Sequence, residues 1–131
     1  MKYFTIAELC KSDTAVRKNI DNSPTSEIIN NLEQLVRYIL DPLREKYGKP
    51  IRVNGAYRCP ELNKAVGGSK TSQHMTGQAA DITVGTSEQN KRLFQLIIDL
   101  DLPFDQLIDE NKFKWIHVSY SPRNRKQILH L

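Results

Sequence analysis

The sequence predicts an α+β fold, in which a small antiparallel sheet packs helices on one face and leaves a cleft on the other. Two stretches alternate with the period of two that is typical of strands with one buried face. In residues 78–84 and 115–120 the apolar side chains fall on one side, at Ala80, Ile82, Val84, Ile116 and Val118. Longer segments repeat apolar residues at helical spacing, so we expect helices to cover that apolar face.

The chain begins with short elements. Residues 5–8 match a capping box, which predicts a short helix from Ile6. Residues 11–22 are polar and rich in turn formers, so we expect mostly loop there, with a short helical turn from Ala15 as the alternative.

The longest helix is expected next, with Ser23 as its N-cap and Pro24 at its first helical position. Pro42 should kink this helix because proline cannot donate the helical hydrogen bond, and Gly48 should end it. Its apolar residues keep a helical spacing and should face the core: Ile28, Leu32, Leu35, Val36, Ile39, Leu40 and Leu43.

The second half predicts strands around two helices. Thr86 caps the longer helix, whose buried face is expected at Leu93, Leu96, Ile97 and Leu100. The other expected elements are a strand at 51–57, a short helix at 60–66, strands at 78–84, 104–109 and 115–120, a turn at 110–114, and an edge strand at 127–130. No internal repeat or domain boundary interrupts the 131 residues, so we expect a single domain, 1–131.

Composition excludes several classes. The 39% hydrophobic and 26% charged content is typical of a soluble globular protein, and no window approaches a membrane span. The N-terminus lacks the apolar core of a signal peptide, so synthesis in the cytoplasm is expected.

The net charge of +4 is scattered apart from a run at Arg123, Arg125 and Lys126, which we interpret as solvated surface rather than a nucleic-acid site. Cys10 and Cys59 are expected to be free thiols, with Cys59 a small buried residue.

Two of the polar residues on the strands can bind metal. Asp81 and His117 both point away from the apolar face, so neighbouring strands would place them side by side above the sheet. His74 would come from the loop entering the first strand, where Gly77 and Ala79 let the backbone and a substrate come close. Two imidazoles and a carboxylate are a usual ligand set for catalytic zinc, although a single histidine is as often a hydrogen-bonded or surface residue.

The motif Ser-x-His-x-x-Gly-x-Ala-x-Asp at residues 72–81, followed by Trp115-x-His117, resembles the zinc D-alanyl-D-alanine carboxypeptidases and VanX-type dipeptidases. Phage endolysins that cut peptidoglycan stems and the Hedgehog signalling domain share their fold. Residues 54–63 also resemble the segment before that motif in phage and bacterial members. The resemblance implies a Hedgehog/DD-peptidase-like fold, with one zinc ion held by His74, Asp81 and His117.

A zinc peptidase also needs a general base. VanX-like members have a glutamate three residues before the last histidine, but this position is Lys114 here. The Hedgehog-like arrangement places a glutamate at the end of the preceding strand, which Glu110 matches. Asp109 competes, because Leu107 and Ile108 are both apolar and alternation does not decide which acid faces the cleft. We predict Glu110 as the base.

Two further residues are predicted to bind substrate. Arg58 can pair with a substrate carboxylate, as an arginine in the matching segment of related enzymes does. Ser72 can hydrogen-bond the substrate backbone or orient His74; either residue could instead be an ordinary surface or turn residue.

The sequence therefore predicts a monomeric zinc peptidase acting on peptidoglycan peptides, either releasing a terminal D-alanine or cutting inside the stem. A mild positive charge suits an anionic cell-wall polymer. The absence of a signal peptide favours a lysin released by a phage holin or carried on a virion. The alternative is a zinc-stabilised binding module without turnover, as in Hedgehog.

Overall fold

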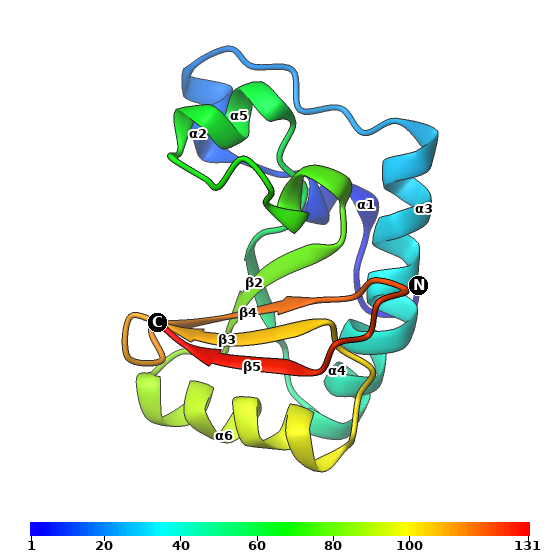
Figure 1. Cartoon of the computed structure of the whole chain (residues 1–131), viewed down its shortest axis with the longest axis vertical. Coiled ribbons are helices and arrows are strands. Elements are labelled where there is room, and N and C mark those ends of the chain that lie inside the picture. Colours follow the sequence, from blue (N-terminus) through cyan, green and yellow to red (C-terminus); the bar gives the residue numbers. More distant parts are fainter.

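The helices of the first half form one long rod beside a small upper group (Figure 1). The computed structural model describes all residues, 1–131. The rod consists of α3 (Ser26–Leu35), a π-helical turn η1 (Val36–Leu40) and α4 (Asp41–Tyr47). The upper group consists of α1 (Ile6–Leu9), α2 (Asp13–Arg17), α5 (Pro60–Ala65) and the 3₁₀ turn η2 (Gln73–Thr76). The last helix, α6 (Ser87–Asp99), lies apart from this group. None of these helices is long and apolar enough to cross a membrane.

The five strands form one sheet in the order β1-β2-β4-β3-β5. Their bounds are β1 (Arg52–Gly55), β2 (Ala79–Thr83), β3 (Gln106–Glu110), β4 (Trp115–Ser119) and β5 (Gln127–His130). The first four strands pair antiparallel, whereas β5 runs parallel to β3. The sheet is therefore mixed rather than wholly antiparallel as predicted. After β4 the chain crosses the start of β3, and β5 then runs in the same direction as β3.

The core lies on one face of this sheet, as the alternation predicts. Ala80, Ile82, Ile116 and Val118 have no exposed surface and belong to one cluster with the residues of the rod and of α6. In Figure 1, α6 lies beneath the strands and the rod runs along their side. Burial of these apolar side chains is the main favourable contribution to the fold, and it leaves the opposite face of β2, β4 and β3 for polar residues.

Local signals placed most helix ends correctly. Thr5 caps α1, and Thr86 and Gln89 form a complete capping box on α6. Gly48 ends α4 in the left-handed conformation, with φ of 78°, which glycine adopts without strain. Pro42 has no N–H for the carbonyl four residues earlier, and the rod accommodates this with the π-helical turn that directly precedes it.

Two expected starts were wrong. The long helix begins at Ser26 with Thr25 as its N-cap, because the Thr25 hydroxyl accepts the Ile28 N–H. Ser23 instead bonds to Asp21 outside the helix. The predicted loop contains α2, whose N-cap Ser12 accepts the Ala15 N–H. The first error came from choosing between neighbouring residues that can all cap. The second came from the polar, turn-forming composition of residues 11–22, although the helical turn named from Ala15 does lie within α2.

Candidate metal centre

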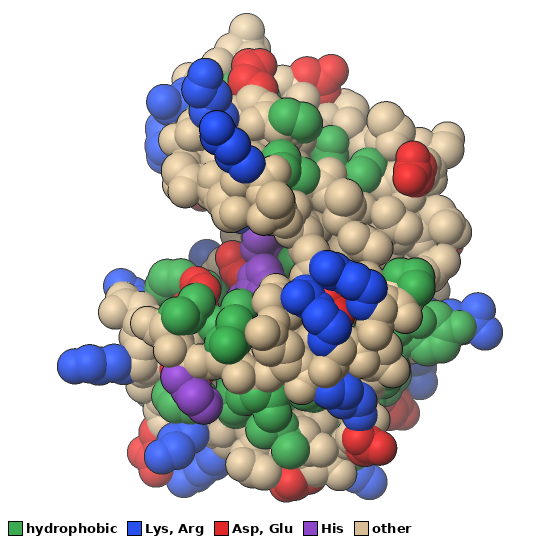
Figure 2. All heavy atoms as spheres, viewed as in Figure 1, with side chains coloured by type: hydrophobic (Ala, Val, Ile, Leu, Met, Phe, Trp, Pro, Cys, Tyr) green, Lys and Arg blue, Asp and Glu red, His purple; other side chains and the backbone are tan.

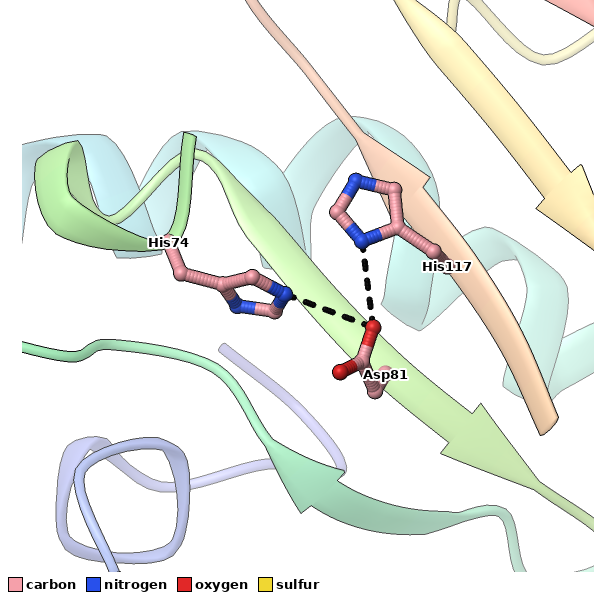
Figure 3. Close-up of side chains that lie close together, drawn as sticks. All are labelled: His74, Asp81 and His117. Carbon is pink, nitrogen blue, oxygen red and sulfur yellow. Dashed lines mark hydrogen bonds and ion pairs between the residues drawn. The ribbon is translucent and has the colours of Figure 1, made fainter. Parts of the chain in front are cut away.

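Three metal-capable side chains meet on the polar face of the sheet (Figure 3). Asp81 on β2 and His117 on β4 are direct partners in the antiparallel register, and His74 reaches them from η2. Asp81 Oδ1 lies 3.1 Å from His117 Nδ1 and 3.3 Å from His74 Nε2. One donor atom from each residue lies within 4.8 Å of the others. The structure thus brings together the three residues that strand parity and the motif indicated.

The protonation of His74 favours a cation between these groups. Its Nδ1 lies 2.6 Å from the carbonyl oxygen of Ala56 and must donate to it, since a carbonyl only accepts. In neutral imidazole, Nε2 then carries a lone pair, and this lone pair faces the Asp81 carboxylate. Two lone pairs facing each other are unfavourable unless a proton or metal ion lies between them. A backbone partner for the second ring nitrogen is also usual in metal-binding histidines.

The spacing of the donor atoms fits zinc. Bonds of about 2.0–2.1 Å in a tetrahedron put neighbouring ligand atoms roughly 3.3 Å apart. The two distances at Asp81, 3.1 and 3.3 Å, agree with that spacing. Three protein ligands also leave one tetrahedral position open, as in catalytic rather than structural zinc sites. The donor set and its geometry therefore fit a catalytic metal.

Asp81 is held in its charged form. Burial raises the pKa of its carboxyl group, but hydrogen bonds and positive charge from His117 and His74 in their protonated forms lower it more, so the pKa falls well below its usual range. A metal ion held between the same groups would supply that positive charge with both imidazoles neutral. A carboxylate that stays ionised is ready to bind a cation.

The metal-capable residues lie in a cleft of about 520 Å³. Figure 2 shows this hollow between the upper group of helices and the sheet, with histidine and acidic side chains inside it. Three buried polar atoms without a hydrogen-bond partner belong to residues lining the cleft, namely Arg58 Nε, Gln73 Oε1 and Trp115 Nε1. Native proteins rarely leave such atoms unpaired, so we expect water or a bound ligand to supply their partners.

The register distinguishes the two acids of β3. Ile108 pairs with His117, so Glu110, two residues on, shares the cleft face and lines the cleft. Asp109 pairs with Ile116 on the other face, where it is buried and forms an ion pair with His130. Glu110 is thus the β3 carboxylate that faces the metal-capable residues; its role as base stays a prediction.

Arg58 and Ser72 also line the cleft. The Arg58 Nη2 donates to Ser72 Oγ at 3.4 Å, and its backbone N–H donates to the His74 carbonyl at 3.0 Å. Burial lowers the pKa of the Arg58 guanidinium, while Asp81 and Glu110 oppose that change. Ser72 caps η2 by accepting the His74 N–H, so it holds the backbone of His74 as one of its two predicted roles requires. Their roles toward substrate stay predictions.

Comparison with known proteins identifies the family. Residues 2–119 match the profile of the Peptidase M15 family. The chain belongs to this family. Over 86 residues it is 40% identical to the zinc D-Ala-D-Ala carboxypeptidase of Streptomyces albus G, an alignment that covers 63% of this chain. The aligned part is 32% of that relative, so the chain matches about a third of its length.

Two expectations about neighbouring residues were wrong in this member of the M15 family. Gly77 does not leave room for a substrate, because a Cβ there would meet Ile28 and Leu32 of α3 at 3.0–3.2 Å. Its φ of 72° and this close contact explain the glycine. Cys59 is only partly buried, and its sulfur caps α5 by accepting the Leu62 N–H at 3.4 Å.

The sequence reasoning also missed a second polar cluster. Asp105, Gln73, Arg123 and Arg125, which we call the Asp105 cluster, join the start of β3 to η2 and to the segment before β5. Arg123 and Arg125 are exposed to solvent, as expected, but they also line the cleft and pair with a buried carboxylate. The only sequence signal was the run of basic residues itself.

Proposed function

We propose that this chain is a zinc-dependent peptidase that hydrolyses peptidoglycan stem peptides, either as a D-Ala-D-Ala carboxypeptidase or as an endolysin-like endopeptidase. The observation that carries the proposal is that His74, Asp81 and His117 share one cleft with Glu110 and Arg58. Membership of the M15 family and similarity to a zinc D-Ala-D-Ala carboxypeptidase support it.

In this proposal, His74 Nε2, Asp81 Oδ1 and His117 Nδ1 hold the zinc. A bound zinc ion supplies Lewis acidity toward a peptide carbonyl and lowers the pKa of water to about 7. The Ala56 carbonyl keeps the proton of His74 on Nδ1, which leaves Nε2 free to bind the metal.

The other cleft residues handle the proton and the substrate. Glu110 accepts the proton of the attacking water and passes it to the leaving amine. Arg58 binds the C-terminal carboxylate of the peptide, since its Nε is buried without a partner and its charge is not neutralised by a direct ion pair. Trp115, opposite Glu110 in the hairpin register, forms a wall of the cleft.

The test is mass spectrometry of purified muropeptides after incubation with zinc-loaded protein. Loss of one terminal alanine supports the carboxypeptidase, and two peptide fragments support the endopeptidase. Intact muropeptides with stoichiometric zinc would contradict the proposal and favour a binding module.

We propose that the enzyme acts as a monomer. Light scattering at assay concentration tests this. Access to the cell wall after phage- or holin-mediated release stays a prediction, and it would be contradicted if the protein added externally or released by a holin left walls undigested.

A further inference from the structure

The Asp105 cluster forms a wall of the cleft beside the metal-capable residues. The Asp105 carboxylate is fully buried and fixes Arg125 with a two-bond fork, in which Nε and Nη2 each donate at 2.9 Å. The Arg125 backbone N–H adds a bond of 3.0 Å. Arg125 is therefore held rigidly, and its hydrogen-bonding capacity is largely used within the chain.

Arg123 is held much less. It makes one bond to Asp105, from Nη2 at 3.3 Å, and its side chain remains 60% exposed. The other donors of this guanidinium have no partner of their own in the chain. Since one carboxylate faces two arginines, the cluster keeps a net charge of about +1 on the cleft wall. Figure 2 shows Lys and Arg side chains gathered beside the hollow.

Gln73 adds an acceptor at the same place. Its Nε2 donates to Asp105 Oδ2 at 2.8 Å, and this fixes the amide orientation because a carboxylate only accepts. The Oε1 atom is then turned away from Asp105, and it is buried without a partner. An N–H group of a bound peptide would satisfy it.

The cluster lies on the side of the metal-capable residues opposite to Arg58. In the strand order β1-β2-β4-β3-β5, Asp81 and His117 occupy the two strands β2 and β4, Arg58 follows β1, and Asp105 precedes β3. A peptide with its C-terminus at Arg58 and its cleaved bond at the metal would extend its N-terminal part toward the Asp105 cluster.

We propose that Arg123 and Gln73 form a second carboxylate-binding subsite, which selects peptides bearing a free carboxylate on the N-terminal side of the cleaved bond. Arg123 pairs with this carboxylate while Gln73 Oε1 accepts a neighbouring peptide N–H. The inference rests on the proposed function. Arg123 lies beyond residues 2–119, so the subsite uses a segment outside the region that the family profile matches.

The test compares two synthetic peptides that are identical except that one carboxylate, N-terminal to the cleaved bond, is a carboxamide in the second peptide. For the zinc-loaded protein, kcat/KM should be about tenfold higher for the acid, because a charge-assisted pair is lost with the amide. Arg123→Gln should bring the ratio close to one. Arg92→Gln, at an exposed arginine of α6, is the matched control and should keep the wild-type ratio.

Calorimetric titration of the same peptides into Glu110→Gln separates the subsite from the proposed reaction. The acid should bind about tenfold more tightly, and adding Arg123→Gln should remove the difference. If neither peptide is cleaved but this Arg123-dependent difference in Kd is present, the subsite stands and the proposed function fails. Equal cleavage and equal Kd for the two peptides, a preference that survives Arg123→Gln, or no binding of either peptide would overturn the subsite.

Discussion

Two aspartates near the same cleft differ in their hydrogen-bond partners: Asp81 lines the cleft, and Asp105 is buried beside it. Asp105 accepts five N–H bonds, from Gln73, Arg123 and three nitrogens of Arg125. Asp81 faces two imidazole nitrogens, and His74 has already committed its one proton in the neutral form to a backbone carbonyl. A carboxylate saturated by donors is part of the scaffold, whereas a carboxylate facing the lone pair of His74 Nε2 needs a proton or a metal ion between the two atoms.

The arginines near the two aspartates differ in the same way. Arg125 spends its donors on Asp105, but Arg58 has a buried Nε without a partner and only a long bond to Ser72. The arginine with unsatisfied donors is the one suited to bind a ligand. The comparison predicts that changes at the metal-capable residues alter metal content and turnover, while loss of the Asp105 carboxylate itself alters stability.

The largest effect is expected for His117→Ala. Loss of one of three protein ligands should remove stoichiometric zinc and abolish detectable turnover, and it should lower the thermal midpoint because bound metal stabilises the folded state. Metal analysis and peptide hydrolysis measure these effects. His130→Ala is the control, since His130 pairs with Asp109 on the other face of the sheet. Full zinc content in His117→Ala would contradict the assigned site.

Glu110→Gln should have the next largest effect. The change is nearly isosteric, so fold and zinc content should be kept, while loss of the proton acceptor should lower kcat by about 10²–10⁴. Asp109→Asn should retain turnover, because its side chain lies on the opposite face. Rates are to be measured at equal zinc occupancy. A dead Asp109→Asn with an active Glu110→Gln would mean that Asp109 is the base.

The contrast between these acids marks the limit of prediction from sequence. Strand alternation and helix caps are local, so the sheet face, the starts of α1 and α6 and the meeting of Asp81 with His117 could be predicted. Leu107 and Ile108 are both apolar, and only the pairing with β4 revealed that Glu110 faces the cleft.

The Asp105 cluster could not be predicted for a different reason. Gln73 lies 32 residues before Asp105 and Arg125 lies 20 after it. Side-chain bonds between loops so far apart leave no periodic pattern in the sequence. The metal-capable residues are equally distant, but the motif at 72–81 and its resemblance to known peptidases replaced the missing local signal.

Asp105→Asn should reduce stability rather than chemistry. An amide in place of the carboxylate removes the charge that binds two arginines, and its NH₂ group meets other donors, so a loss of about 2–3 kcal/mol is expected. Urea unfolding of the zinc-loaded protein measures it. Asp99→Asn, at an aspartate bonded only to Gln95 on α6, should change stability by less than about 0.5 kcal/mol. Unchanged stability with zinc loss in Asp105→Asn would reverse the comparison.

Arg58→Ala tests the unsatisfied arginine. The substitution keeps the backbone N–H that bonds to His74 and removes only the long side-chain bond to Ser72, so the thermal midpoint should change little. For peptides with a free C-terminal carboxylate, kcat/KM should fall about 10–100-fold, and peptides with an amidated C-terminus should be nearly unaffected. Arg92→Ala is the matched control for loss of a positive charge. Unchanged cleavage of free-carboxylate peptides would favour an internal cut.

The smallest effect is expected in the pH dependence of stability. The hydrogen bond from the Arg125 side chain lowers the pKa of Asp105 most, burial opposes this, and the Arg125 N–H and Gln73 lower it further, so the folded pKa lies well below the usual range. A group with a lowered folded pKa stabilises the protein above its unfolded pKa of about 4, and this contribution is lost as the pH falls toward the folded value.

The wild type should therefore lose more unfolding free energy than Asp105→Asn between pH 6 and pH 3, and the gap between the two should narrow in acid. Both proteins are to be measured without metal. Asp81 is present in both, so the effect of its own titration on the unfolding free energy cancels in the difference. A gap that stays constant or widens as the pH falls would show that Asp105 does not stabilise the fold through its charge.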